Sequence, residues 1–360
     1  MTPLVRQRHL VLLTCLCLTA SSAACGGNAD DDGGLDVDAG DSDTDGGVGS
    51  GADAMPAVDA TPPFFGDPAE PGPYSVHAED EVTATVDTVE AAITVCSPSD
   101  DGGATVAAGR FPAIVVSPGF QLPRTQYRSM CDHLASWGYV VLLQDYPRGG
   151  SIFNPPNHQT LAEDVGLLLD WALSPASGLA EHIDASLLAV AGHSLGGKVS
   201  ILAAILDSRI KAVIGWDPVD ANPPIGNGSP SVTPELMDGL TVPMALLGET
   251  LDSQGTFQSC APAADNYQQY FDHACQAPEV LEVTVDGADH MDWIDDRGSC
   301  GFTCNVCQNG ATEDSYTREL TRRVTVGFLE VQLRGREDLR PFLSAPELGS
   351  GTSVRQGPGC

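Results

Sequence analysis

Basic side chains are scarce in this sequence. Lys and Arg together number 17 against 49 Asp and Glu, which gives a formal net charge of −32 over 360 residues. Nucleic acids are bound through cationic groups that face the phosphates, so this imbalance argues against a nucleic-acid partner. No internal repeat is visible either. With 42% hydrophobic residues the chain can still bury a sizeable core, in one large α/β domain or two modest ones.

The apolar run near the N-terminus is too short to span a bilayer. It is the segment LVLLTCLCLTA, which follows a basic start and precedes small residues. This pattern predicts a secretory signal peptide over residues 1–24. The following AACGG resembles a bacterial lipoprotein processing site, which implies a lipid anchor on Cys25 and an exported protein, held by the membrane at the cell surface or in the periplasm. Ordinary cleavage with an unmodified Cys25 is the alternative, because Ser22 stands where Leu is usual.

Lys and Arg are absent from 28 to about 73, where Asp, Gly and Ala dominate. Such a segment buries too little apolar surface to offset the entropy of ordering, so we predict a disordered acidic tether over 25–73. Residues 41–46 match the opening of a calcium-binding loop, but Ala52 stands where a bidentate Glu is needed, and no specific metal site is expected. The folded domain is predicted over 74–340 and a flexible C-terminal tail over 341–360.

Apolar strand-like runs alternate with helical segments through the predicted domain. This alternation predicts an α/β fold with a mostly parallel sheet covered by helices on both faces. A hairpin of antiparallel edge strands is expected over 81–95. The predicted strands are 111–120, 138–144, 187–191, 210–216, 241–248 and 280–285, and the predicted helices are 124–136, 161–173, 196–206 and 317–333.

The segment Gly192-His193-Ser194-Leu195-Gly196 joins one of these strands to the next helix. It matches G-x-S-x-G in the strand–turn–helix context of a nucleophile elbow. A Cβ at Gly192 or Gly196 would collide with the neighbouring strand or helix, while Ser194 would project from the sheet edge. The pattern therefore predicts an α/β-hydrolase fold with Ser194 as the nucleophile. A Gly-rich turn with a capping serine is the alternative.

The partners of Ser194 are sought at the carboxyl ends of the other strands. In α/β-hydrolases the oxyanion is bound by the amide after the nucleophile and by one from an earlier loop, which here gives Leu195 and Phe120. The base follows the acid in chain order, and His290 alone among the histidines lies beyond the final predicted strand. We therefore predict His290 as the base. A surface histidine in an acidic turn is the alternative.

Several further motifs follow one another along the chain. They are GHSLGGK (192–198), IGWDPVD (214–220), CAP (260–262), DHMDWIDD (289–296), CNVCQNG (304–310) and the pair at 322–323. Together they resemble the motifs of chlorophyllases. The likeness runs in the same order from Phe111 to Arg336 and implies ester hydrolysis. Upstream, VVSPGF resembles the cutinase-like polyester hydrolases and platelet-activating-factor acetylhydrolases of the same superfamily. Chlorophyllases usually carry Arg where this chain has Leu195, so the likeness supports ester chemistry more firmly than a pigment substrate.

Two aspartates compete for the role of the triad acid. Position in the fold favours Asp252, which follows the strand that most often presents the acid. The resemblance implies Asp217, in the Asp-Pro-Val turn one strand earlier. We take Asp217 as the acid and keep Asp252 as the alternative. In either place the carboxylate would fix the His290 tautomer and stabilise the imidazolium.

Eight cysteines remain once Cys15, Cys17 and Cys25 are set aside. An exported chain with this number is expected to contain disulfides, although the pairings cannot be derived from spacing. The alternative is zinc at Cys300, Cys304 and Cys307, which lie at ligand-like spacings without an obvious fourth ligand. We expect neither a metal nor another cofactor.

The sequence thus predicts a serine carboxylic-ester hydrolase that acts on small hydrophobic esters through an acyl-enzyme. One alternative is a true chlorophyllase that releases chlorophyllide and phytol. The other is a catalytically silent surface lipoprotein that retains the fold to bind a ligand. Nothing in the sequence indicates an oligomeric state.

Overall fold

The structure of the protein is a computed structural model. This structure describes residues 66–151, 153–220, 229, 231–252, 260–304, 307–358 and 360. The predicted signal peptide, Cys25 and most of the predicted tether lie outside the described residues.

Strands in the described part of the chain form a single sheet of nine, in the order β1-β2-β4-β3-β5-β6-β7-β8-β9. The six from β4 to β8 in this order are parallel to one another, while β1, β2 and β9 pair antiparallel at the two edges. This confirms the predicted α/β-hydrolase architecture. The strands are β1 (Ser75–Val86), β2 (Val89–Ser99), β3 (Phe111–Ser117), β4 (Val140–Gln144), β5 (Ile183–His193), β6 (Ile210–Trp216), β7 (Met244–Glu249), β8 (Val280–Val285) and β9 (Thr352–Gly357).

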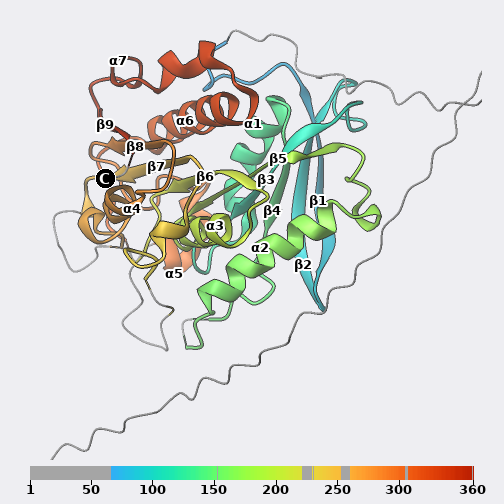
Figure 1. The fold of residues 1–360 in the computed structure, drawn as a ribbon, viewed down its shortest axis with the longest axis horizontal. Helices are drawn as coiled ribbons and strands as arrows, with labels where there is room; N and C mark the ends of the chain where they lie inside the picture. The colour runs from blue at the N-terminus through green and yellow to red at the C-terminus, as the bar shows by residue number, and fades with distance from the viewer. Residues whose placement is uncertain are drawn as a thin grey trace, which may run out of the picture. The chain divides into compact units, whose positions relative to one another are not determined.

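Helices cover both faces of the sheet (Figure 1). One face packs against α1 and α6 and the other against α2 and α3, and each face has its own apolar core. The central strands β3, β4 and β7 are buried along their whole length, as near-continuous apolar runs in a covered parallel sheet should be. The helices are α1 (Arg128–Ser136), α2 (His158–Ala172), α3 (Leu195–Leu206), α4 (Tyr267–His273), α5 (Gly301–Cys304), α6 (Asp314–Arg334) and α7 (Ala345–Leu348).

The C-terminal segment corrects one prediction. Residues 341–360 were expected to be a flexible tail, but they contain α7 and β9, and β9 pairs with β8 at the edge of the sheet. The sequence TSVRQG carries little apolar signal because β9 is only half-buried. Besides its backbone pairing with β8, the strand makes a long-range ion pair, in which Arg355 Nη2 lies 2.5 Å from a carboxylate oxygen of the buried Glu282.

Ordered contacts at the other end begin before Tyr74, where the domain was predicted to start. Arg323 of α6 binds both carboxylate oxygens of Asp67, at 2.9 and 2.7 Å. The carbonyl of Pro68 lies 2.8 Å from His133 Nε2 on α1. The last residues of the predicted acidic segment are therefore part of the packed domain.

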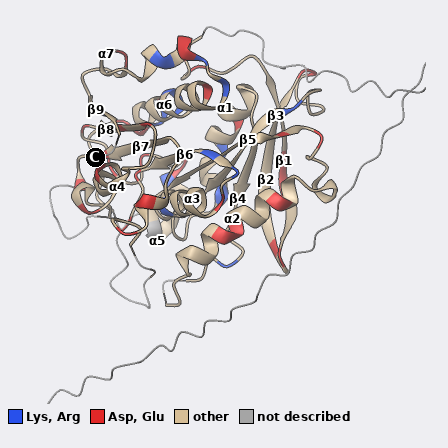
Figure 2. Cartoon of the chain, in the orientation of Figure 1, with Lys and Arg blue, Asp and Glu red and all other residues tan. Residues whose placement is uncertain are grey.

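Acidic side chains are spread over the domain rather than confined to its N-terminal segment. Figure 2 shows them on α2 and on the β1–β2 hairpin. Among the described residues, no helix is both long and apolar enough to cross a bilayer.

The turn from β5 into α3 leaves no room for a side chain at its two glycines. A Cβ at Gly196 would lie 2.0 Å from the carbonyl oxygen of Ser117 on β3, and one at Gly192 would lie 2.3 Å from the backbone of Gly196. Both distances are far below van der Waals contact, which confirms the predicted collisions. The glycines allow helix α3 to begin directly against the neighbouring strand.

Replacing Gly196 with Ala should therefore destabilise the protein although Ala is the better helix former. We expect Gly196→Ala to lower the free energy of unfolding by about 3 kcal/mol or more, measured by urea titration. Gly166 of α2 is the matched control, because a Cβ added there would meet only Asp207, at 3.4 Å. Gly166→Ala should instead stabilise by about 0.5–1 kcal/mol. Equal effects of the two substitutions would contradict this packing argument.

Candidate active site

The β5–α3 turn holds Ser194 in an unusual backbone conformation. Its φ of 57° and ψ of −121° lie outside the regions that L-residues ordinarily occupy. The Ser194 amide donates to the carbonyl of Trp216 on β6 at 3.0 Å, and the Ser194 carbonyl accepts from Val219 at 3.2 Å. Strain of this kind persists only where the surroundings fix it, and it frees the side chain from capping α3.

Ser194, His290 and Asp217 form a continuous hydrogen-bonded chain. His290 Nε2 lies 2.9 Å from Ser194 Oγ, and its Nδ1 lies 2.5 Å from Asp217 Oδ2. The three residues follow β5, β8 and β6, so parallel strands deliver them to the same edge of the sheet. All three are buried. The arrangement allows His290 to take the Ser194 proton while the carboxylate orients the ring.

Asp252, the alternative acid, lies nearby but is hydrogen-bonded differently. Its Oδ2 accepts from the amides of Cys260 and Ala261 at 2.6 and 2.7 Å. Its negative charge favours protonation of His290 and of Asp217. The carboxylate that accepts a hydrogen bond from His290 Nδ1 is that of Asp217.

The loop after β3 lies against Ser194. A Cβ at Gly119 would come within 3.3 Å of Ser194 Cβ, so the backbone that leads into Phe120 passes beside the serine. Leu195 is the first residue of α3, and amides in the first turn of a helix have no acceptor within that helix. Both predicted oxyanion donors are thus on segments that adjoin Ser194.

Burial affects the protonation state of His290. It lowers the pKa of His290, although the negative charges of Asp252 and Asp289 act in the opposite direction and raise it. Burial also raises the pKa of Asp217. A neutral imidazole at neutral pH is the form that can accept a proton.

The turn that carries His290 is braced by an ionic cluster that the sequence did not reveal. Arg297 binds the carboxylates of Asp289 and Asp292, and Asp289 also accepts from the amides of Met291 and Gly310. Both aspartates are buried. The carboxylates of Asp289 and Asp292 therefore have a structural role. Their partner Arg297 directly follows the motif DHMDWIDD (289–296), but that motif by itself did not indicate the ion pairs.

A second unpredicted pair holds the segment after Asp217. Lys198 of α3 is fully buried, and its Nζ donates to the carbonyl of Asp220 at 2.8 Å and lies 3.4 Å from the carboxylate. The same carboxylate accepts from the amides of Val232 and Thr233. Lys198 lies two residues after the elbow in sequence, but only the fold shows what it contacts.

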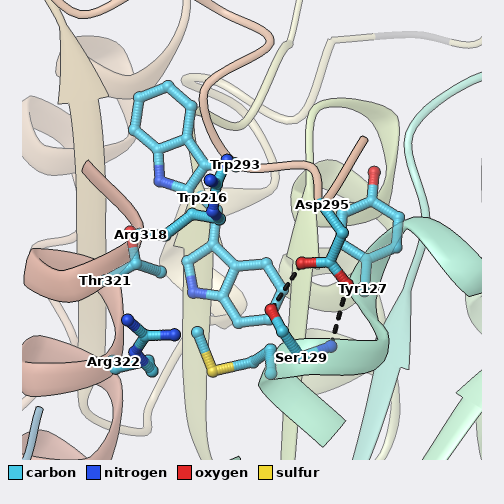
Figure 3. A pocket seen from close by; sticks show the side chains of 9 residues that line it. Tyr127, Ser129, Trp216, Trp293, Asp295, Arg318, Thr321 and Arg322 are labelled. Atoms are coloured by element: carbon cyan, nitrogen blue, oxygen red, sulfur yellow. Dashed lines mark hydrogen bonds between the residues drawn. The ribbon is translucent and has the colours of Figure 1, made fainter. Parts of the chain in front are cut away.

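A small cavity lies behind this site between α1 and α6 (Figure 3). Its wall is formed by Tyr127, Trp216 and Trp293, together with Met130 and polar groups of both helices. Ser194, His290 and Asp217 do not line it. It is therefore separate from the position where a substrate would meet the serine.

The eight remaining cysteines form four disulfides, which confirms the expected class of bond. The pairs are Cys96–Cys131, Cys260–Cys307, Cys275–Cys360 and Cys300–Cys304. The three cysteines considered as zinc ligands are thus in disulfides. Among the described residues there is no group of His, Cys, Asp and Glu arranged to hold a metal ion.

Comparison with known proteins gives one matching family. The family model described as chlorophyllase matches residues 71–350. Chlorophyllase-1 of Arabidopsis thaliana is 29% identical over 263 residues, which cover 67% of this chain and 78% of that protein. A chloroplastic chlorophyllase-1 of Citrus sinensis is 28% identical (66% and 74% covered), and a cutinase of Thermobifida fusca is 26% identical (64% and 71% covered).

The lowered pKa of His290 predicts how the reactivity of Ser194 depends on pH. Neutral imidazole is lost only as the pH falls through this pKa, so reactivity should persist below the usual imidazole value of about 6.5. We expect the rate constant for fluorophosphonate labelling at pH 6 to stay within about twofold of its value at pH 7.5. Circular dichroism should show that the protein is folded at each pH. A labelling rate that falls to half its maximum at pH 6.5 or above would then contradict the lowered pKa of His290.

Proposed function

This chain belongs to the chlorophyllase family, and from that premise we propose that it is a serine esterase with Ser194 as nucleophile, His290 as base and Asp217 as acid. It is a carboxylic ester hydrolase, as are its chlorophyllase and cutinase relatives. The observation that carries the finer proposal is the unbroken set of contacts from Ser194 Oγ through His290 to Asp217.

In the first half of the reaction, Ser194 Oγ attacks the ester carbonyl carbon while His290 Nε2 accepts the hydroxyl proton. The carbonyl oxygen becomes an oxyanion that accepts hydrogen bonds from the amides of Phe120 and Leu195. The C–O bond to the alcohol then breaks, and His290 returns the proton to the departing oxygen. The products are the free alcohol and an acyl group on Ser194.

In the second half, water replaces the alcohol. His290 removes a proton from the water as its oxygen attacks the acyl carbon, and the proton passes to Ser194 Oγ when the acyl–serine bond breaks. The acid product then leaves. Asp217 remains ionised beside the imidazolium and keeps Nε2 directed toward Ser194.

The surroundings of Ser194 favour neutral, hydrophobic esters. Leu195 is buried in the apolar core on the α2–α3 side, so it presents no cation to an anionic part of a substrate. The net charge of −32 adds a general disadvantage for polyanions. Cleavage of chlorophyll is the second candidate, and the family match supports it.

The protein is exported and anchored through a lipid on Cys25. Four disulfides fit an oxidising compartment outside the cytoplasm. The lipid itself is supported by the N-terminal sequence, since Ala23-Ala24-Cys25-Gly26-Gly27 follows a basic start and an apolar run.

The choice of triad acid predicts an order of effects on hydrolysis of p-nitrophenyl butyrate. Ser194→Ala should abolish turnover in a folded protein. Asp217→Asn should lower kcat on the order of 10³–10⁴-fold because the His290 tautomer is no longer fixed, and Asp252→Asn should lower it by less than about tenfold. Steady-state kinetics on the three variants check this, and the reverse order for the two aspartates would assign the acid to Asp252.

Substrate preference separates the two candidate activities. Because Leu195 supplies an apolar side chain where chlorophyllases usually place Arg, kcat/KM should be at least about tenfold higher for p-nitrophenyl butyrate than for chlorophyll. Both substrates are to be compared in the same detergent, with release of p-nitrophenol and of chlorophyllide as readouts. Faster cleavage of chlorophyll would identify a chlorophyllase in the literal sense.

The anchor predicts where a variant without the cysteine is found. Cys25→Ser should lose incorporation of a labelled fatty acid and move from the membrane to the soluble exported fraction. An acidic chain has no affinity of its own for an anionic bilayer, so the lipid alone should retain it. Membrane association that survives the substitution would show a different anchor.

A further inference from the structure

One buried hydrogen-bonded chain crosses beneath the candidate site without including any triad side chain. The Gly119 amide donates to the Tyr127 hydroxyl at 3.0 Å. That hydroxyl lies 2.8 Å from His193 Nδ1, and His193 Nε2 lies 2.7 Å from the backbone carbonyl of His290. Tyr127 and His193 are buried, with 1% and 0% of their surface exposed.

The atoms available fix the direction of every bond in this chain. The His290 carbonyl can only accept, so His193 Nε2 must carry the hydrogen. Burial lowers the pKa of His193, and the neutral ring has an unprotonated Nδ1. That nitrogen must accept from the Tyr127 O–H, whose oxygen is left to accept from the Gly119 amide. Each buried polar group thus has its partner, and the chain has a single consistent polarity.

The ends of this chain lie on the segments that the proposed reaction uses. Gly119 immediately precedes Phe120, the proposed oxyanion donor. His193 immediately precedes Ser194, and the accepting carbonyl belongs to His290 itself. The Tyr127 hydroxyl therefore links the oxyanion loop to the backbone of the base, through the residue next to the nucleophile.

The element that bears Tyr127 is also joined directly to the His290 turn. Tyr127 ends the 3-10 helix η1 (Arg124–Tyr127). The side chain of Gln126 exchanges hydrogen bonds with the backbone of Asp296, at 2.9 Å in both directions. Ser129 donates its amide to Asp295 at 2.8 Å, and its hydroxyl also contacts that carboxylate. Figure 3 shows Asp295 reaching across to Ser129 beside the Tyr127 ring.

From this geometry we infer that Tyr127 is a positioning residue of the proposed esterase: through His193, its hydroxyl holds the Gly119–Phe120 loop and the His290 turn at the spacing that the transition state requires. The inference rests on the proposed function. Tyr127 does not reach the substrate, because its hydroxyl is used by Gly119 and His193 and its ring packs near Trp216 at a centroid distance of 6.3 Å.

Removal of this one oxygen has a specific effect. In Tyr127→Phe the ring still packs beside Trp216, but the Gly119 amide and His193 Nδ1 lose their buried partner. The Gly119–Phe120 loop and the His290 turn can then shift. Displacements below 1 Å of an oxyanion donor or of a base chiefly reduce the stabilisation of the transition state. Substrate binding before reaction depends less on these groups. The effect should therefore appear in kcat rather than in KM.

The test compares Tyr127→Phe with Tyr139→Phe. Tyr139 is equally buried, and its hydroxyl donates to Glu330 at 2.7 Å, but it precedes β4 at the opposite end of the strands from the site. With p-nitrophenyl butyrate, Tyr127→Phe should lower kcat on the order of 10–100-fold and change KM by less than about twofold. Its affinity for phenylboronic acid, which forms a tetrahedral adduct on the serine, should fall by a similar factor. Tyr139→Phe should keep kcat within about twofold although it loses a comparable buried hydrogen bond.

Each other outcome has a distinct meaning. Wild-type kcat in folded Tyr127→Phe overturns the inference, and so does an equal loss in Tyr139→Phe, which would show a general effect of lost stability. If Tyr127→Phe does not fold, His193→Gln is tested in its place. The Gln amide can still donate to the His290 carbonyl, but no acceptor nitrogen then occupies the position of His193 Nδ1 beside the Tyr127 hydroxyl. Wild-type kcat in that variant overturns the inference as well. Activity retained in Ser194→Ala would refute the proposed function itself rather than the role of Tyr127.

Discussion

The close approach of α3 to β3 is the constraint on which the site depends. At Gly196 there is no room for a Cβ beside the Ser117 carbonyl. Ser194 alone separates β5 from α3, and it has a positive φ of 57°. That conformation turns Oγ away from the helix and toward His290. The same turn leaves the first amides of α3 without helical acceptors, next to the serine. The proposed nucleophile and one proposed oxyanion donor thus both lie at this packing contact.

The other site groups are held by buried polar contacts rather than by apolar packing. Arg297 fixes the acidic turn around His290, and Lys198 fixes the segment that follows Asp217. Tyr127 joins the base to the loop after β3. Buried polar groups that have found partners disfavour other arrangements, because a shift would leave a donor or acceptor unsatisfied. A rigid site of this kind suits a reaction whose barrier is lowered by fixed dipoles.

Local patterns in the sequence predicted the parts of the fold that are locally encoded. The buried strands read as apolar runs, and the elbow read as two glycines around Ser194. Strand β9 was missed because it carries little apolar signal and its contacts, such as that of Arg355 with Glu282, join residues 73 positions apart. Tyr127 was missed for the same reason, since its partner His193 lies 66 residues away. Arg297 lies only five and eight residues from Asp292 and Asp289, but no local pattern indicated these ion pairs. The resemblance favoured Asp217 over Asp252 as the acid, and the contact between Asp217 and His290 Nδ1, which only the fold supplies, supports that choice.

The central claim is that Ser194 carries the acyl group during ester hydrolysis. Rapid quenching of the enzyme with p-nitrophenyl butyrate, followed by peptide mapping in a mass spectrometer, tests it directly. If Ser194 carries the acyl group, a butyryl group will be found on the peptide that contains Ser194. This adduct should form as fast as the burst of p-nitrophenol and should be removed at the steady-state rate. Turnover of the ester with no covalent adduct, or with the adduct on another residue, would contradict it.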